Sequence, residues 1–384
     1  MKRLALAVCS LLCVAASSSA TPGPGGVASD NVEWVRSVPF AAGYAEGGRL
    51  LDGYFYVTVN GQGMLIFDVA DPEDPQLVGR YPAPHFWENE DVATNGKIAL
   101  ISQRSYPFTY FGAQQYADLA VLDVEDKANP TLIATIPGGG DHTYECLFGC
   151  KWAYGPVGGG IYDLRDPSNP KMLEERWVDA LPPGTFVHDV TEVRPGFVIT
   201  SSIPMYLLDV RKSLTEPKVI ALSEISNNSG HNVVWPRRGK DELILTATEG
   251  THVRCETRDE QDSAAFEVWD ASRWKKTHTF TSLGQWSVPG NGVWTDGQPP
   301  VSGYYGCSAH WFQEHPDFNG GGLVALGFYG HGVRFLDVER NGDTEEVGFF
   351  LGWGANTSAA YWITDEIVYT VDMQRGIDVL RMTR

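Results

Sequence analysis

The sequence predicts an all-β protein whose mature part is a single seven-bladed β-propeller, and three observations lead to this prediction. Seven copies of a short repeat run through the chain, and each copy is rich in Val, Ile, Tyr and Phe between turn residues. No segment longer than a few turns has helical periodicity. Units of about forty residues with roughly four short strands each are typical of propeller blades.

The first twenty residues have the features of a cleavable secretory signal. Lys2 and Arg3 precede an apolar stretch that ends in small residues at Ala20. This stretch is too short to span a bilayer, and no later segment is apolar for long enough to do so. We therefore expect a secreted or periplasmic protein without a membrane span, with a signal peptide at 1–20, a flexible segment at 21–30 and the propeller at 31–384.

The repeat is clearest in its first four copies. In each copy a short apolar strand ends in an aspartate, a polar turn with proline follows, and a second strand begins. The segments are MLIFDVADPEDPQLVGRYP (64–82), LAVLDVEDKANPTLIATIP (119–137), GIYDLRDPSNPKMLEERW (160–177) and YLLDVRKSLTEPKVIALSE (206–224). Weaker copies follow at 266–282, 333–350 and 376–384. The repeat aspartates are Asp68, Asp123, Asp163, Asp209, Asp270, Asp337 and Asp378.

The two ends of the chain complement each other. The last copy stops at Arg384 after its third strand, whereas residues 32–39 (VEWVRSVP) form a strand without a blade of its own. Pairing of these two strands would leave no large open sheet edge at the seam. We therefore expect the N-terminal strand to close the propeller.

The segments MLIFDVADPEDPQLVG and LAVLDVEDKANPTLIA resemble the LVIVD repeat, a propeller repeat found mainly in secreted or surface proteins of bacteria and archaea. The resemblance extends over nearly the whole mature chain and is loose in the last three copies. It implies a fold and no particular activity.

The net charge disfavours some classes of binding partner, and the cysteine content bears on the redox state of the compartment. Lys and Arg number 29 against 48 Asp and Glu, a formal charge of −19, which disfavours nucleic acid and anionic membranes as partners. Four of the six cysteines remain after signal removal. In an oxidising compartment we expect disulfides Cys146–Cys150 and Cys255–Cys307, with free buried thiols as the alternative.

Histidine recurs where the innermost strand of a blade begins. That strand lines the central channel of a propeller, so its side chains converge from different blades. Four successive copies have histidine there, in DHTYECL, VHDVTEV, GHNVVW and AHWF, although the chain has only 9 histidines. We therefore expect His142, His188, His231 and His310 to meet on the axis.

The corresponding places in the other three copies hold Glu46, Glu90 and Tyr361. Neutral imidazole is the commonest ligand of transition metals, and carboxylates nearby suit divalent Fe, Mn, Zn, Ni or Cu better than Ca or Mg. The sequence thus predicts a metal site of four histidines, with Tyr361 and Glu90 as candidate catalytic groups. The alternative is a channel whose polar residues hydrogen-bond only to water and backbone.

Four axial histidines in a seven-bladed propeller resemble the ferrous iron centre of the carotenoid-cleaving oxygenases. They are also similar to the histidine-lined axial sites of the selenium-binding protein/methanethiol oxidase family. The resemblance is one of arrangement, without matching motifs around the histidines, and it implies no substrate.

Two classes of function follow. The first is a metal-dependent enzyme acting on a small molecule or glycan, either as an oxidase or oxygenase or as a lyase in which Tyr361 or a histidine is the base. The second is a non-catalytic secreted or surface propeller that binds a protein or glycan through its long insertions at 104–117, 249–265 and 284–306.

Overall fold

The structure, a computed structural model, describes residues 21–23, 25–83, 89–103, 117–225, 230–250, 264–288 and 307–384. The predicted signal peptide lies outside the described residues. Among the described residues, no helix is both long and apolar enough to cross a membrane.

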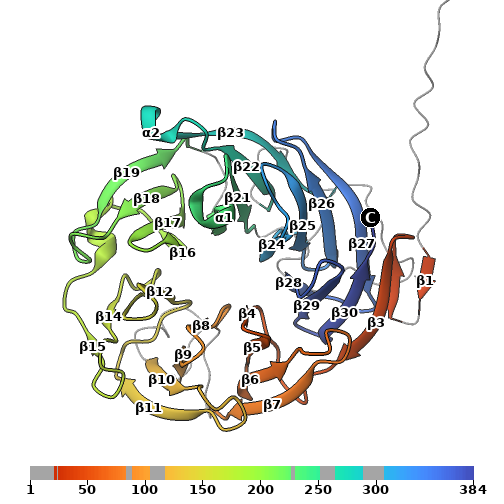
Figure 1. Ribbon diagram of the computed structural model, residues 1–384, viewed down its shortest axis with the longest axis horizontal. Coiled ribbons are helices and arrows are strands. Elements are labelled where there is room, and N and C mark those ends of the chain that lie inside the picture. The colour runs from red at the N-terminus through yellow and green to blue at the C-terminus, as the bar shows by residue number, and fades with distance from the viewer. Residues whose placement is uncertain are drawn as a thin grey trace, which may run out of the picture.

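The chain is all-β and propeller-like, with its sheets arranged in a ring in sequence order (Figure 1). The first three sheets along the chain have four strands each. The first contains β4 (Gly48–Leu51), β5 (Tyr54–Val59), β6 (Gly63–Asp68) and β7 (Gln76–Tyr81). The second contains β8 (Ala93–Thr94), β9 (Ile98–Gln103), β10 (Asp118–Asp123) and β11 (Thr131–Ile136). The third contains β12 (Glu145–Leu147), β13 (Trp152–Tyr154), β14 (Ile161–Asp163) and β15 (Lys171–Met172).

The next sheet has eight strands. It contains β16 (Val187–Arg194), β17 (Phe197–Ser202), β18 (Tyr206–Asp209), β19 (Lys218–Ser223), β20 (Gly230–Val234), β21 (Leu243–Thr248), β22 (Phe266–Asp270) and β23 (Thr279–Trp286). Two parallel residue pairs between β19 and β23 join its halves. The short helical segments are Trp177–Ala180, α1 (Pro236–Gly239) and α2 (Trp274–Thr277).

The last two sheets include strands from the N-terminal part of the chain. One contains β24 (Phe312–Glu314), β25 (Gly322–Gly327), β26 (Val333–Val338), β27 (Thr344–Gly352), β2 (Gly26–Ala28) and β1 (Thr21–Gly23). The other contains β28 (Thr357–Trp362), β29 (Ile367–Asp372), β30 (Gly376–Met382) and β3 (Val32–Val38).

Two of these pairings concern the N-terminal segments. β3 pairs antiparallel with β30, from Val32 opposite Met382 to Val38 opposite Ile377. A flexible segment was expected at 21–30, but residues 26–28 form strand β2, which pairs with β27. Val27 is buried among apolar side chains of that strand.

The repeat aspartate stabilises the turn after the third strand of a sheet. The Asp68 carboxylate accepts a hydrogen bond from the backbone N–H of Ala70 at 2.8 Å, and the carboxylate of Asp123 accepts the same bond from Glu125 at 2.9 Å. Asp163, Asp209 and Asp270 repeat this contact with the residue two positions on. Such side-chain bonds define a turn that no regular strand can continue through.

The seventh copy departs from this pattern. Asp378 lies inside β30, and its carboxylate accepts hydrogen bonds from Arg375 Nε at 2.6 Å and Trp34 Nε1 at 3.2 Å. The third strands β6 and β30 both begin at a glycine with a φ of 89°, Gly63 and Gly376. Aligning on these glycines puts Arg381 where Asp68 stands, so Asp378 is not the seventh repeat aspartate.

The core lies between neighbouring sheets. Phe55 and Val57 of β5 pack with Tyr369 and Val371 of β29, and all four are fully buried. Each such side chain contributes about 1.5–3 kcal/mol by leaving water. Because both faces of most sheets are packed in this way, the innermost strands hold a fixed position around the axis.

Candidate metal centre

The four predicted histidines converge, and each lies at or just before the start of an innermost strand. His142 precedes β12, His188 and His231 are the second residues of β16 and β20, and His310 precedes β24. The ring centroids of successive neighbours are 4.8, 4.1 and 3.9 Å apart. The chain thus brings together four side chains that are 168 positions apart at their extremes.

A repeated irregularity of the backbone turns two of these side chains, His188 and His231, toward the axis. The pairing of β16 with β17 skips from Val187 to Asp189, and that of β20 with β21 skips from Gly230 to Asn232. The unpaired residue at each bulge is the histidine between them. A bulge of this kind re-aims a side chain that regular pleating would direct into a sheet interface.

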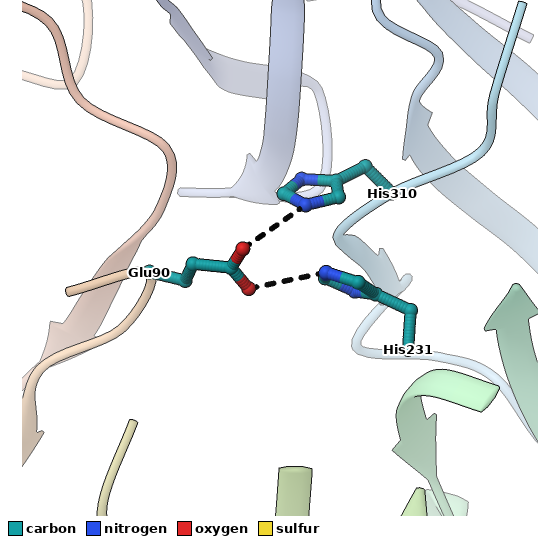
Figure 2. A group of neighbouring side chains, drawn as sticks. All are labelled: Glu90, His231 and His310. Carbon is teal, nitrogen blue, oxygen red and sulfur yellow. Dashed lines mark ion pairs between the residues drawn. The ribbon is translucent and has the colours of Figure 1, made fainter. Parts of the chain in front are cut away.

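The Glu90 carboxylate lies at the centre of the histidines. Its Oε1 is 3.1 Å from His142 Nε2 and 3.4 Å from His310 Nε2, while its Oε2 is 3.1 Å from His231 Nε2 and 4.0 Å from His188 Nε2. Figure 2 shows Glu90 reaching toward His231 and His310 from the opposite side of the channel. The Trp311 indole N–H donates to Glu90 Oε2 at 3.1 Å and holds the carboxylate in place.

A close backbone contact positions Glu90 as well. An added Cβ at Gly47 would lie only 1.7 Å from the carbonyl oxygen of Glu90. Since no side chain fits in that space, glycine is required at position 47 for the two segments to approach.

Hydrogen bonds fix which ring nitrogen faces Glu90. His188 Nδ1 lies 3.1 Å from the carbonyl oxygen of His231, and His310 Nδ1 lies 2.9 Å from that of Ser358. A carbonyl only accepts, so Nδ1 carries the hydrogen in both rings and the neutral ring has its lone pair on Nε2. Metal-binding histidines are commonly oriented by such a bond from the other ring nitrogen.

The titration of the site reflects burial together with close charge. Burial alone would raise the pKa of Glu90, but the four imidazoles, His142 foremost, outweigh it and hold that pKa well below its usual range. Burial and neighbouring imidazoles lower the pKa of His188 and His231. Burial would also lower the pKa of His310, yet the Glu90 charge outweighs it and the pKa is raised. The site therefore holds one carboxylate anion, with His188 and His231 favouring the neutral ring and His310 protonated more readily.

These distances suit a shared cation. Two ligand atoms at about 2.1 Å from one ion lie about 3.0–3.4 Å apart when the angle between them is 90° to 110°. Three of the four contacts between Nε2 and the Glu90 oxygens fall at 3.1–3.4 Å. Among the described residues, Glu90 with His231 and His310, and Glu90 with His142 and His188, each offer three ligand atoms within 4.8 Å of one another.

Sequence reasoning missed a second carboxylate, Glu249. Its Oε1 lies 3.6 Å from His310 Nε2 and accepts a hydrogen bond from the Tyr329 hydroxyl at 2.7 Å. The Tyr329 ring is 4.6 Å from that of His310, and Tyr329 adopts a φ of 33° that non-glycine residues rarely show. Neither residue is on an innermost strand, because Glu249 follows β21 and Tyr329 follows β25.

Tyr361 lies on β28 as expected, but a different residue of that strand faces the cluster. The pairing of β28 with β29 skips from Thr357 to Ala359, so Ser358 is the bulge residue that corresponds to His188 and His231. Ser358 Oγ lies 2.8 Å from His310 Nδ1 and donates to the carbonyl oxygen of Glu46. The Tyr361 hydroxyl accepts a hydrogen bond from the backbone N–H of Gly48 at 2.9 Å, and burial raises its pKa far above the usual value.

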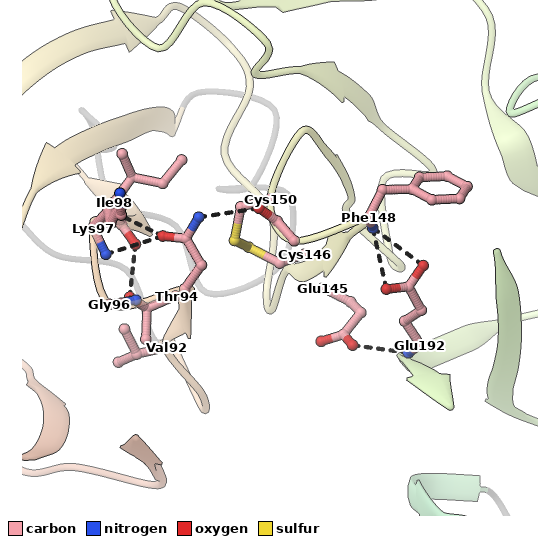
Figure 3. Close-up of a disulfide and its surroundings, with 12 residues drawn as sticks. Val92, Thr94, Gly96, Lys97, Ile98, Glu145, Cys146, Phe148, Cys150 and Glu192 are labelled. Atoms are coloured by element: carbon pink, nitrogen blue, oxygen red, sulfur yellow. Dashed lines mark hydrogen bonds between the residues drawn. A yellow bond between two sulfur atoms is a disulfide. The ribbon is translucent and has the colours of Figure 1, made fainter. Parts of the chain in front are cut away.

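A disulfide lies beside the site. Cys146 of β12 and Cys150 are joined across the turn to β13, with their Cα atoms 4.4 Å apart (Figure 3). Glu145, next to Cys146, accepts a hydrogen bond from the backbone N–H of Glu192 at 2.8 Å, which links β12 to β16. Cys307 is buried and disulfide-bonded. Cys255, the partner expected for it, lies outside the described residues.

Comparisons with known proteins agree with this fold. Residues 42–83 match the family model described as the LVIVD repeat. The solved β-propeller domain of Cps50 (Swd1) from Myceliophteria thermophila is similar, with a TM-score of 0.61 and 9% identity over 92% of this chain and 100% of that chain. No curated protein matches the sequence significantly. The chain therefore contains an LVIVD repeat and has a β-propeller fold, and the low identity carries no functional conclusion.

Proposed function

We propose that this chain is an exported, metal-dependent oxidoreductase of the oxidase or oxygenase type, with one divalent transition metal ion on the axis of a seven-bladed propeller. His142, His188, His231, His310 and Glu90 would bind the ion. The donor set of imidazoles and carboxylate suits Fe, Mn, Zn, Ni or Cu.

The blade count is part of the proposal. The eight-stranded sheet would be two four-stranded blades, since only two residue pairs join β19 to β23. β1 and β2 would be additions to the outer edge of the sixth blade. The pairing of β3 with β30 would then complete the seventh blade and close the ring.

One observation carries the metal assignment. His188 and His310 use Nδ1–H toward backbone carbonyls, so each ring, when it is neutral, presents an Nε2 lone pair to the oxygens of an ionised Glu90. Lone pairs that face one another in a buried site repel unless a proton or a metal ion lies between them. One metal ion would satisfy the Nε2 lone pairs of His188 and His310 and both oxygens of Glu90 at once.

The ion would supply Lewis acidity and, for a redox-active metal, activation of dioxygen. The surrounding residues would hold its ligands: Trp311 orients Glu90, and Ser358 orients His310. Glu249, hydrogen-bonded to Tyr329, lies near enough to His310 to accept or return a proton at the ion.

The oxidoreductase class is favoured over a lyase that uses Tyr361 as its base. Deprotonating Tyr361 is unfavourable because its hydroxyl is buried, and that oxygen already accepts the Gly48 N–H. We propose a small molecule or a glycan as the substrate. We also propose that the protein is exported, and the disulfide Cys146–Cys150 is consistent with an oxidising compartment.

Elemental analysis of the purified full chain tests the proposal. We expect close to one equivalent of transition metal, and a marked loss of it in His231→Ala and His310→Ala while the circular dichroism spectrum is retained. His278→Ala, at the exposed end of α2, is the matched control and should keep the metal. Oxygen uptake with candidate reductants should depend on the metal in the same way.

A metal-free wild-type protein that gains no metal on incubation with Fe, Mn, Zn, Ni or Cu would overturn the enzyme proposal. The alternative function, a secreted or surface propeller that binds a protein or glycan without catalysis, would then account for the fold.

A further inference from the structure

A cavity of about 250 Å³ lies beside the metal centre, and its wall follows the same innermost strands. Asp91, Asp189, Asn232 and Trp311 line it, and each comes directly after Glu90, His188, His231 or His310 in the sequence. The volume approaches the lower limit of small-molecule sites. The channel thus contains a chamber next to the histidine cluster that the metal ligands themselves do not fill.

The cavity wall carries more negative than positive groups. Asp91, Asp189, Glu145 and Glu314 line it, and Arg49 is the one basic residue among its lining residues. Arg49 forms an ion pair with Asp91, and its Nη2 is 3.8 Å from Glu145 Oε2. The cavity wall therefore has four carboxyl groups and one guanidinium group, so acidic groups outnumber basic ones.

The pKa values of Glu145 and Glu314 are consistent with too few positive charges in the cavity. Burial raises the pKa of Glu145 to about 7, although Arg49 opposes the shift, and burial raises the pKa of Glu314 to about 7. Both carboxyls would gain from a cation that entered the cavity, because it would replace the lost hydration of their charged forms.

An independent observation points to a hydrogen-bond donor as ligand. Asn232 is 1% exposed, and its Oδ1 accepts no hydrogen bond from any described residue. A buried amide oxygen without a donor costs about 1–3 kcal/mol. Asn232 lines this cavity and also a smaller one with Ser201 and Thr246, and a ligand N–H that reaches its Oδ1 would remove that cost.

The acceptors are too far apart to chelate an ion directly. Every group of three ligand atoms within 4.8 Å among the described residues contains a histidine, and none includes Asp91, Glu145, Asp189 or Glu314. Separated acceptors around a chamber of this size fit an organic cation, which carries several N–H donors on an extended body.

We propose that this cavity binds a small organic cation through ammonium groups and rejects anions of the same size. The site is separate from the metal centre, so the proposal does not depend on metal binding. Glu145 and Glu314 would pair with the cationic groups, and Asn232 Oδ1 would accept an N–H.

Calorimetric titration of the full, metal-stripped chain with 1,4-diaminobutane at about 0.15 M salt tests this proposal, since surface attraction is screened there. We expect saturable binding that weakens about tenfold or more in Glu145→Gln and in Glu314→Gln, because each loses one charged partner. Glu345→Gln, on the exposed part of β27, removes the same charge outside the cavity and should leave the affinity unchanged.

Succinate and 1,4-butanediol are the anionic and neutral probes of matched length, and neither should bind. Absence of diamine binding, equal binding of succinate, or equal weakening by Glu345→Gln would overturn the proposal. Glu145→Gln and Glu314→Gln are made as separate variants, so that the proposal can still be tested if one of them fails to fold. Metal content measured in parallel reports on the metal centre alone.

Discussion

His188 and His310 have the same local chemistry although they are 122 positions apart in the sequence. Each ring donates Nδ1–H to a carbonyl of the next innermost strand along the chain and turns Nε2 toward Glu90. The four histidines could be predicted because one residue type recurred at one repeat position. Glu249 and Tyr329 could not, since they lie outside the innermost strands and reach the cluster only through the packing of neighbouring sheets.

The contact between Gly47 and Glu90 leads to a prediction. In Gly47→Ala the new methyl group would overlap the Glu90 carbonyl, so the segment carrying Glu90 must move and the carboxylate must leave the histidines. We expect a several-fold lower metal-to-protein ratio by elemental analysis. Gly53→Ala is the control, because open space surrounds Gly53 and the new methyl group would meet no other atom there, although the positive φ of Gly53, unlike the backbone of Gly47, is itself strained by alanine. Equal metal content in the two variants would contradict the role of Gly47.

His331, which is not one of the proposed metal ligands, predicts a pH dependence of stability. Burial, with a smaller effect of Arg334, lowers its pKa to about 3. In the unfolded chain this histidine is protonated below about pH 6.5, whereas in the folded chain it stays neutral until the pH approaches 3. The free energy of unfolding therefore falls as the pH drops from about 6.5 toward 3. The fall from this one residue is about 1.4 kcal/mol per pH unit.

Urea unfolding between pH 6.5 and 4.5 checks this expectation. His331→Gln should show a shallower decline of the unfolding free energy with falling pH than the wild type. Parallel curves for the two proteins would mean that His331 is not held neutral by the fold.

The bulge at the start of an innermost strand is the element that makes the site. It occurs at His188, His231 and Ser358, in each case at the second residue of the innermost strand. The repeat pattern predicted the strands and their order, but it did not predict this extra residue. Tyr361 was consequently chosen on β28 in place of Ser358, whose small side chain carries no signal of its own.

The turn between β12 and β13 gives the second prediction about an element. Phe148, Gly149 and Cys150 all have positive φ, and the disulfide Cys146–Cys150 restrains the turn that contains them. Replacing both cysteines by alanine frees the unfolded chain and should lower the free energy of unfolding by about 2 kcal/mol. Thermal unfolding checks this value, and with reductant present, which also reduces the disulfide of Cys307, the wild type and the double variant should be equally stable. An unchanged melting temperature would refute a stabilising role.

Strand β3, near the start of the described chain, pairs with β30, its last strand. β3 pairs with β30 over most of its length, and Val32 is buried with apolar residues of the neighbouring sheet. The N-terminal strand was predicted from its position alone, because it had no partner nearby in the sequence. The hairpin of β1 and β2 on β27 was not predicted, since its short, glycine-rich strands have no repeat pattern.

Deleting residues 31–39 removes β3 and should expose the edge of β30 with which β3 pairs. Exposed sheet edges promote association, so we expect the truncated protein to aggregate and to melt at a lower temperature. Size-exclusion chromatography and calorimetry measure both properties. A monomeric truncated protein with unchanged melting would show that β3 is not needed to hold the ring.

The central claim is that one metal ion lies on the axis between Glu90 and the four histidines. Anomalous diffraction at the absorption edge of the metal found by elemental analysis tests it most directly. The account predicts a single strong peak at about 2.0–2.2 Å from the ligand atoms of His142, His188, His231, His310 and Glu90. A metal-loaded crystal with its peak elsewhere, or with no peak among these five residues, would contradict the account.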